Sequence, residues 1–179
     1  MKSKLTLLFL SAGLCLAATN LKAQRLFFIF GHLQYNSPSG GNFRDAYKFG
    51  LGAEAGAGLG WGRTFLTGTI GYDRYKVEDA YKAKRPEARD LSLTPVKLGI
   101  RQYILAKKIY LKADGGVAFA NNNDQKKSCA TWDAGVGLKL GILDLGVDYG
   151  ATNFALSGFT NTSQNIPAFQ FKAGLAFGL

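Results

Sequence analysis

The residues that could carry chemistry in this chain are few, and its single histidine is the first to consider. A Ser-His-Asp centre needs an imidazole that takes a proton from a serine hydroxyl, and only His32 could supply that imidazole. The sequence fixes no serine beside His32. One histidine and one cysteine in separate segments also lack the spacing of metal ligands. We therefore expect no catalytic residue, no cofactor and no metal, with His32 packed inside the fold or at its rim.

Two further features could be chemical. The stretch 50–55 loosely matches a dinucleotide-binding fingerprint, but that motif needs a strand-to-helix turn, and no amphipathic helix follows. We interpret Gly50, Gly52, Gly56 and Gly58 instead as small inward positions that make room for bulky or charged neighbours. Cys129 falls in an expected loop over 121–130, where the thiol either forms an intermolecular disulfide or has no role.

The elements that position these residues are predicted by apolar and polar residues that alternate with a period of two, which indicates strands. Each segment is long enough for a tilted membrane crossing, which needs about 9–11 residues. Eight segments show the pattern: approximately 25–35, 47–59, 64–75, 92–104, 108–120, 131–141, 143–155 and 167–179. Long links (36–46, 76–91, 121–130 and 156–166) alternate with tight ones, as in an up-and-down barrel with all its long loops on one side.

The two faces of these segments differ in charge. One face is apolar and carries no charge, as expected where strands meet lipid. The other face collects the charges: Glu54, Asp73, Lys97, Arg101, Lys112, Asp114, Asp133, Lys139, Asp144, Asp148 and Lys172. Buried charges are costly unless they are paired, so six acids beside five bases predict a network inside the lumen. Register suggests three pairs: Lys97 opposite Asp114, Lys139 opposite Asp144, and Asp148 opposite Lys172.

The last segment has the clearest alternation. Its apolar face carries Phe169, Phe171, Leu175, Phe177 and Leu179, and we interpret it as the closing strand of a transmembrane barrel. The first segment fits less well, because Leu26, Phe28 and Phe30 lie on the face opposite its apolar set. Either these three side chains fill the lower lumen, or the strand begins later.

Large aromatic residues fall near the expected strand ends, where interfacial anchoring is the natural interpretation. They are Trp61, Trp132, Tyr35, Tyr47, Tyr72, Tyr75, Tyr103 and Tyr149.

Residues 1–23 are predicted to be a signal peptide. Lys2 and Lys4 precede a short apolar run, and a small residue, Ala23, stands at the cleavage position. The alternative is a membrane-anchoring helix, for which the run is short. Removal leaves one domain, 24–179. The net charge of the whole chain is +10, but a basic balance alone is no docking surface for nucleic acid.

With these features in place, the chain resembles the small outer-membrane β-barrel proteins of Gram-negative bacteria, the porin-family group that includes OmpX-like and OmpW-like barrels. The resemblance covers 24–179 and is architectural. It implies an outer-membrane location and assembly by the barrel machinery, which recognises a C-terminal strand such as Phe169 to Leu179. Here the chain ends in Leu179 rather than the commoner aromatic residue. Some barrels of this group modify lipid A, but this chain lacks a His-x-Ser pair resembling the deacylase motif.

The expected fold is therefore all-β, an eight-stranded antiparallel up-and-down transmembrane β-barrel. Side chains nearly fill a lumen of this size, so we expect a structural or interaction protein that acts through its loops, not an enzyme. A narrow conduit for small or hydrophobic molecules is the alternative, and a lipid A-modifying enzyme comes third. The expected partners are outer-membrane lipid, lipopolysaccharide and the assembly machinery. A soluble lipocalin-like barrel, with an apolar lumen and a polar outside, is the structural rival.

Overall fold

The computed structural model describes residues 27–86, 88–105, 108–121, 126–154 and 164–178. Within these residues every strand pairs antiparallel with its neighbours in sequence, and β1 also pairs with β8, which closes the barrel. The strands are β1 (Phe27–Pro38), β2 (Tyr47–Trp61), β3 (Thr64–Val77), β4 (Leu91–Leu105), β5 (Ile109–Asn121), β6 (Lys126–Leu140), β7 (Leu143–Phe154) and β8 (Gln164–Phe177). This confirms the all-β, eight-stranded up-and-down barrel.

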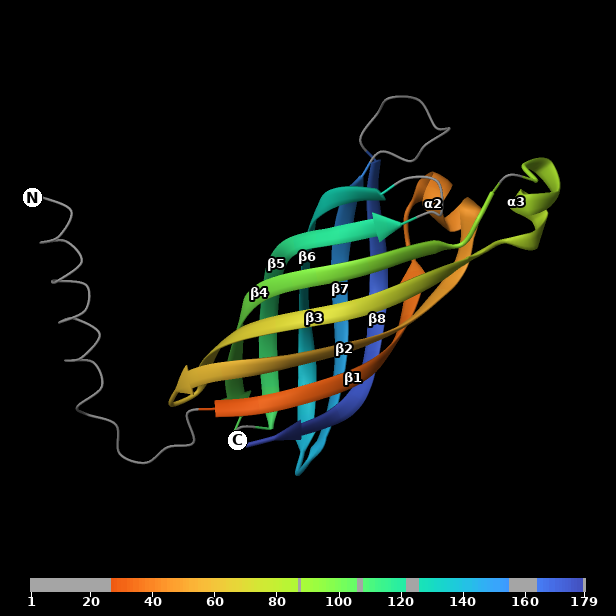
Figure 1. Cartoon of the computed structure of the whole chain (residues 1–179). Coiled ribbons are helices and arrows are strands. Elements are labelled where there is room, and N and C mark those ends of the chain that lie inside the picture. Colours follow the sequence, from red (N-terminus) through yellow and green to blue (C-terminus); the bar gives the residue numbers. More distant parts are fainter. Residues whose placement is uncertain (1–26, 87, 106–107, 122–125, 155–163, 179) are drawn as a thin grey trace, which may run out of the picture.

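The two ends of the barrel differ (Figure 1). Two six-residue helices, α2 (Gly41–Ala46) and α3 (Asp79–Lys84), lie at one end, which we call the loop end. The start of β1 and the end of β8 lie at the other, the turn end. Among the described residues no helix has the length and apolar character that a membrane crossing requires. The predicted signal peptide, 1–23, lies outside the described residues.

Tight hairpins connect neighbouring strands at the turn end. Gly62 and Gly141 adopt φ values of 66° and 63°, a left-handed backbone that glycine reaches without a steric penalty. Each follows directly on a strand, at the end of β2 and of β6, so the chain reverses within two residues before β3 and β7 begin. Such positive φ values are what a two-residue hairpin needs to match the twist of the strands.

The β5–β6 connection corrects one expectation. The sequence predicted a long loop over 121–130, but β6 begins at Lys126, where Lys126 pairs with Asn121. The alternation of buried and exposed residues extends into the part of β6 that was expected to be a loop. Cys129 is buried, and its neighbours Ser128 and Ala130 are exposed. Cys129 therefore lies on a strand and not in a loop.

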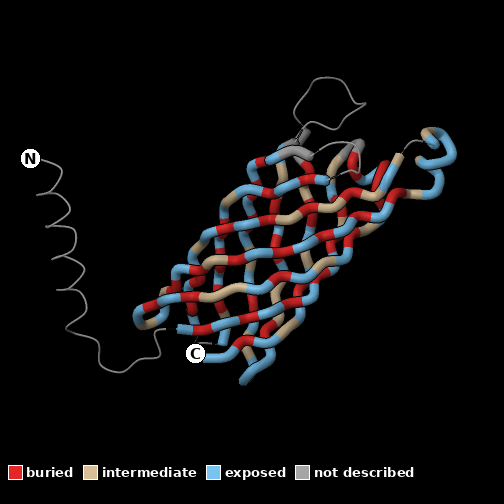
Figure 2. The backbone as a smooth tube through the Cα atoms, in the orientation of Figure 1, coloured by how far each residue is buried: buried red, intermediate tan, exposed pale blue. Residues whose placement is uncertain are grey.

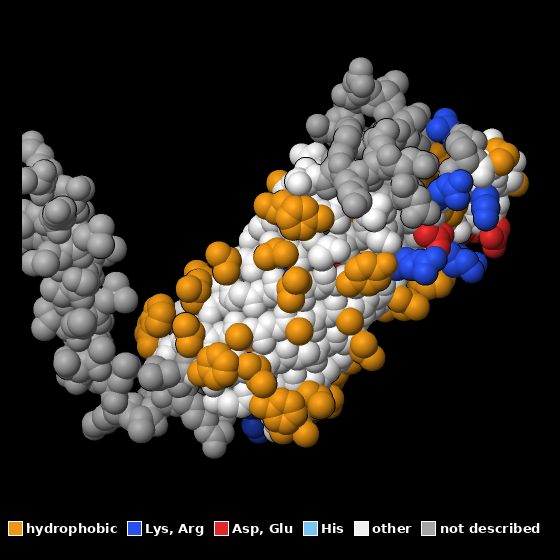
Figure 3. All heavy atoms as spheres, in the orientation of Figure 1, with side chains coloured by type: hydrophobic (Ala, Val, Ile, Leu, Met, Phe, Trp, Pro, Cys, Tyr) orange, Lys and Arg blue, Asp and Glu red, His pale blue; other side chains and the backbone are white. Residues whose placement is uncertain are grey.

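The barrel wall alternates buried and exposed residues along every strand (Figure 2). Most exposed positions along the middle of the strands are apolar, and their side chains are spread over the wall in Figure 3. Leu33, Leu98 and Leu59, for example, are 72%, 68% and 62% exposed. The buried side includes Arg101, Asp133 and Asp144. A soluble lipocalin-like barrel would show the opposite arrangement, so this rival is wrong.

The lumen is filled in three layers. At the turn end is an aromatic layer: Phe28, Phe30, Phe65, Tyr103 and Tyr110, with Ala176. At the loop end is an upper cluster: Phe43, Ala46, Tyr47, Tyr75, Val77, Leu91, Leu93, Ala120, Cys129 and Ile166. Between them is a charged layer: His32, Glu54, Lys97, Arg101, Lys112, Asp114, Asp133, Asp144, Asp148 and Lys172.

Candidate functional site in the barrel lumen

The aromatic layer closes the turn end with rings packed edge to face. The ring centroids of Phe28 and Phe65 lie 5.1 Å apart and those of Phe65 and Tyr103 lie 5.8 Å apart, both T-shaped. Phe28, Phe65 and Tyr103 are fully buried. Of the two alternatives for the first strand, the side chains of Phe28 and Phe30 therefore fill the lower lumen. Leu26 lies outside the described residues.

Glycines make the space for these rings. A Cβ added at Gly56 would overlap the ring of Phe30, one at Gly58 the ring of Phe28, and one at Gly137 the ring of Tyr110. Gly56 and Gly58 lie directly opposite Phe30 and Phe28 in the β1–β2 register. The interpretation of the β2 glycines as small inward positions is confirmed, and β2 leads into another strand, not into the helix that a dinucleotide motif needs.

Arg101 joins the aromatic layer to the charged layer. Its Cζ atom lies 4.1 Å from the ring centroid of Tyr110 and 4.7 Å from that of Phe30. Its Nη1 donates to Asp144 Oδ2 at 2.8 Å. A guanidinium is well suited to this place, because it stacks on aromatic faces while its edge binds a carboxylate.

Lys112 is the centre of the acidic side of the charged layer. Its Nζ lies 2.7 Å from Asp114 Oδ2, 3.1 Å from Asp133 Oδ1 and 2.9 Å from Asp148 Oδ2. One buried ammonium thus faces three carboxylates from β5, β6 and β7. Asp133 and Asp148 also meet a second lysine each, Lys97 and Lys172 respectively.

Glu54 is the carboxylate that contacts the basic residues on the other side of the charged layer. Its Oε2 lies 2.8 Å from Lys172 Nζ and 3.9 Å from Lys97 Nζ, and its Oε1 lies 3.1 Å from His32 Nδ1. The other imidazole nitrogen, His32 Nε2, lies 3.4 Å from Asp144 Oδ2. His32 therefore lies buried between two carboxylates.

These contacts bear on possible chemistry at His32. Its hydrogen-bond and ion-pair partners among the described residues are carboxylates, and none of them is a serine hydroxyl. In a Ser-His-Asp centre one imidazole nitrogen faces a serine hydroxyl, whereas both nitrogens of His32 face carboxylates. The described residues also contain no group of three His, Cys, Asp or Glu side chains that could hold a metal ion.

Three further polar side chains, which the charge pattern of the sequence does not include, donate hydrogen bonds to carboxylates in the lumen. Asn36 Nδ2 donates to Asp73 Oδ1 at 2.6 Å, and Gln34 Nε2 donates to the same oxygen. Tyr110 donates its hydroxyl to Asp144 Oδ1 at 2.6 Å. All three occupy inward positions of the same alternation that placed the charges, so the period-two pattern could have found them.

The pairs expected from register correspond only in part to the structure. Asp114 lies opposite Gly99, while Lys97 lies opposite Gly116 and reaches Asp133 instead. The Lys97–Asp114 pair is therefore wrong, because the strands pair two residues away from the assumed register.

The other two pairs differ from each other. Lys139 does lie opposite Asp144, but its Nζ donates to the carbonyl of Gly141 at the turn end, while Asp144 binds Arg101. Asp148 and Lys172 meet at 2.9 Å although Lys172 lies opposite Gly146. Long side chains in the narrow lumen thus reach past their register partners.

The aromatic positions also need correction. Trp61, Trp132, Tyr35, Tyr72 and Tyr149 are exposed on the outer wall, where an interfacial belt would place them. Tyr47, Tyr75 and Tyr103 are buried in the lumen, so interfacial anchoring is wrong for these three. For Tyr75 and Tyr103 the period-two alternation of β3 and β4 already predicts a side chain that faces the lumen. For Tyr47 the reason is a register shift between Tyr47 and Phe49, since a bulge turns the preceding side chain to the other face.

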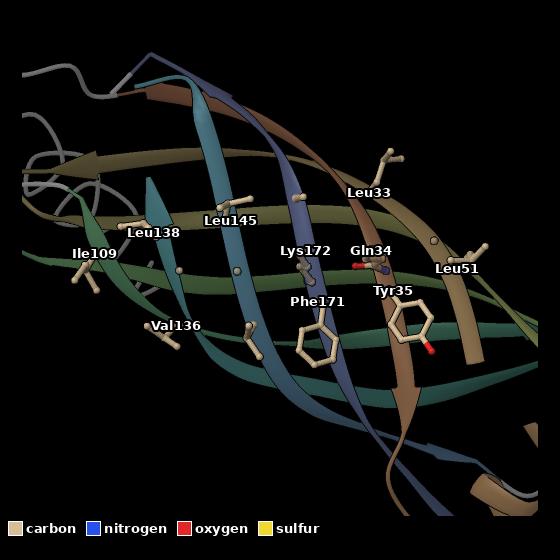
Figure 4. A pocket seen from close by; sticks show the side chains of 15 residues that line it. Leu33, Gln34, Tyr35, Leu51, Ile109, Val136, Leu138, Leu145, Phe171 and Lys172 are labelled. Carbon is tan, nitrogen blue, oxygen red and sulfur yellow. The ribbon is translucent and has the colours of Figure 1, made fainter. Parts of the chain in front are cut away.

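The outer wall carries an apolar groove of about 860 Å³ that extends from Ile109 of β5 across β6, β7, β8 and β1 to β2 (Figure 4). Exposed side chains such as Tyr35 and Phe171 border it, and the buried Gln34 and Lys172 lie behind its floor. It faces the surroundings of the barrel and not the lumen. On β8, Phe169, Phe171, Leu175 and Phe177 are all exposed on this wall, and Leu179 lies outside the described residues.

An uncharged apolar outside around a charged, ring-filled inside defines a membrane-spanning β-barrel. No protein-family model and no curated protein matches the sequence. Among solved structures, the chain is similar to the outer-membrane protein Ail of Yersinia pestis in a bilayer nanodisc, with 12% identity, a TM-score of 0.52, and coverage of 84% of this chain and 99% of that one.

Two further solved structures are similar. Neisserial surface protein A matches with 14% identity, a TM-score of 0.51 and coverage of 86% of this chain and 97% of that one. The N-terminal barrel domain of Pseudomonas aeruginosa OprF matches with 12% identity, a TM-score of 0.54 and coverage of 84% and 97%. The likeness establishes the fold, that of the small outer-membrane β-barrels.

Proposed function

We propose that the protein is a non-conducting structural and interaction protein of the outer membrane. The barrel anchors the chain, and the loop end meets other molecules. The observation that carries this proposal is the filling of the lumen by the aromatic layer, the charged layer and the upper cluster one above another. A solute would have to displace buried ion pairs and packed rings in turn, and breaking a buried pair is strongly unfavourable.

The alternative is a narrow conduit, which the aromatic lower face of β1 could serve. In the structure Phe28 and Phe30 occupy that space themselves, with Gly58 and Gly56 opposite them. This supports the closed barrel over the conduit. The apolar groove of Figure 4 lies on the outer wall and gives no path through the lumen.

Planar-bilayer recording tests the closed lumen. We expect no sustained conductance steps from the refolded wild-type protein. The matched variant is Phe28→Ala combined with Phe65→Ala, which removes two touching rings and should give small, flickering steps. Sustained steps from the wild type would overturn the non-conducting barrel and favour the conduit.

The interaction role is tested at α3. This helix has no buried residue, although Tyr81 packs partly against the upper cluster. Replacing Asp79–Lys84 by Gly and Ser, with Tyr81 kept, should leave a heat-modifiable barrel on SDS gels. After chemical cross-linking on whole cells, we expect this variant to be recovered with fewer bound surface molecules than the wild type. Equal recovery would show that this loop is not the interacting element.

A further inference from the structure

A polar pocket of about 730 Å³ lies on the outside of the barrel at the loop end, where the ends of β3, β4 and β5 meet the α3 segment. Four bases line it, Arg74, Lys76, Lys82 and Arg89, against two acids, Asp79 and Asp90. Figure 3 shows Lys and Arg side chains gathered at this end of the molecule, with acidic side chains beside them and the apolar wall below. The pocket therefore has an excess of two positive charges.

The pocket begins where the apolar wall ends. Along β3 the outward positions Leu66, Ile70 and Tyr72 are exposed and apolar or aromatic, and the next two outward positions are Arg74 and Lys76, also exposed. Tyrosine is typical of the membrane–water interface, and the Tyr72 hydroxyl lies 3.1 Å from Ser92 Oγ. Arg74 and Lys76 thus lie at the depth of the lipid headgroups.

Asp90 holds the pocket in shape. Its Oδ2 accepts a bond from Arg74 Nη2 at 3.0 Å, and its Oδ1 accepts one from the backbone N–H of Val77 at 3.2 Å. This fixes the guanidinium beside β4. Asp90 occupies only part of the donor set of Arg74, since a guanidinium has five N–H groups.

We propose that this pocket binds the phosphate of an anionic lipid of the surrounding leaflet, the lipid A part of lipopolysaccharide. The acyl chains of the lipid lie against the apolar wall directly below, formed by Ile70, Val96 and Leu98. Arg and Lys are the usual phosphate ligands, the former through two parallel hydrogen bonds. A free phosphate or an acidic peptide would use the charges but not this wall, whereas an amphipathic lipid uses both.

The experiment counts lipids that remain bound to the full barrel in native mass spectrometry. The probes are monophosphoryl lipid A and the same lipid after its phosphate has been removed. We expect the wild type to retain the phosphorylated lipid preferentially. Arg74→Gln and Lys76→Gln should each reduce this retention about fivefold, because a cation near an anionic lipid surface contributes on that scale.

The matched control is Lys48→Gln, which removes an exposed base of β2 at the same end but outside the pocket. Equal loss in this control would overturn the site in favour of general charge attraction, as would equal retention of the two lipids. Displacement of the lipid by millimolar inorganic phosphate would overturn the choice of a lipid over a free phosphate. Heat modifiability on SDS gels verifies that each variant is folded, and the outcome does not depend on whether the lumen conducts.

Discussion

In the charged layer each lysine touches two or three carboxylates, whereas in the aromatic layer each ring touches other rings and all but that of Tyr103 also meet a glycine of the neighbouring strand. Lys112 has three carboxylate partners, while Phe28 has two ring partners and Gly58. Removing Lys112 takes the shared cation from three buried carboxylates, of which Asp133 and Asp148 keep one lysine each, but removing a ring leaves only empty volume. The two layers fill one lumen, and they should fail in different ways.

The largest effect is expected for Lys112→Met, which keeps most of the length of the side chain and removes its charge. Asp114, Asp133 and Asp148 then repel one another in a space with little water, and loss of one member of a buried pair costs about 3–5 kcal/mol. Urea unfolding in detergent, followed by tryptophan fluorescence, measures the free energy of unfolding. The control is Lys108→Met at an exposed turn position. If both variants unfold at the same urea concentration, the charged layer does not stabilise the barrel.

The second effect is expected for Phe28→Ala in the aromatic layer. Deleting a fully buried ring costs about 3 kcal/mol through lost burial and the cavity that remains. The matched control is Phe27→Ala, the adjacent residue, which points outward and is 51% exposed. We expect the control to lose less than half as much. A cost for Phe28→Ala that no more than equals that of Phe27→Ala would mean that lipid contact, not lumen packing, holds this end.

The period-two alternation of the strands explains how much of the fold and of the lumen could be predicted from the sequence. The eight strands, their faces and the inward place of residues such as Lys97 and Asp133 follow from a period of two, which depends only on local geometry. Tyr103 obeys the same rule, but its position near a strand end also fits an interfacial residue, so two patterns of the sequence conflict there, and the buried side chain follows the alternation. Tyr47 breaks the rule at a register shift, which no local pattern indicates.

The partners of the charges could not be predicted in the same way. Arg101 of β4 binds Asp144 of β7, and Lys172 of β8 binds Glu54 of β2, so these contacts cross the lumen between strands that are not hydrogen-bonded to each other. Such contacts depend on the shear of the closed barrel and on the length of each side chain. Register between neighbours, even where it is right as for Lys139 and Asp144, does not determine them.

A smaller effect is expected for Gly137→Ala, which overfills the aromatic layer instead of emptying it. The added methyl overlaps the Tyr110 ring and must push its hydroxyl away from Asp144, for a cost of about 2 kcal/mol. Gly115→Ala is the matched control, since a Cβ there meets no atom within 4 Å. The difference in urea midpoint between the two variants measures the packing. Equal midpoints would show that Tyr110 moves aside freely and that the layer is loosely packed.

The smallest effect is expected outside the lumen, at the exposed ion pair of Arg74 and Asp90. Their atoms lie 3.0 Å apart, within the range of distances in the charged layer, but water screens them and exposed pairs contribute less than about 1 kcal/mol. A double-mutant cycle with Arg74→Gln and Asp90→Asn, measured by urea unfolding, gives the coupling energy directly. A second cycle with Arg101→Gln and Asp144→Asn gives it for a buried pair at 2.8 Å. We expect the buried pair to couple several times more strongly. Equal coupling would mean that water reaches the lumen as freely as the surface, and the distinction between a filled lumen and a solvated loop end would then be lost.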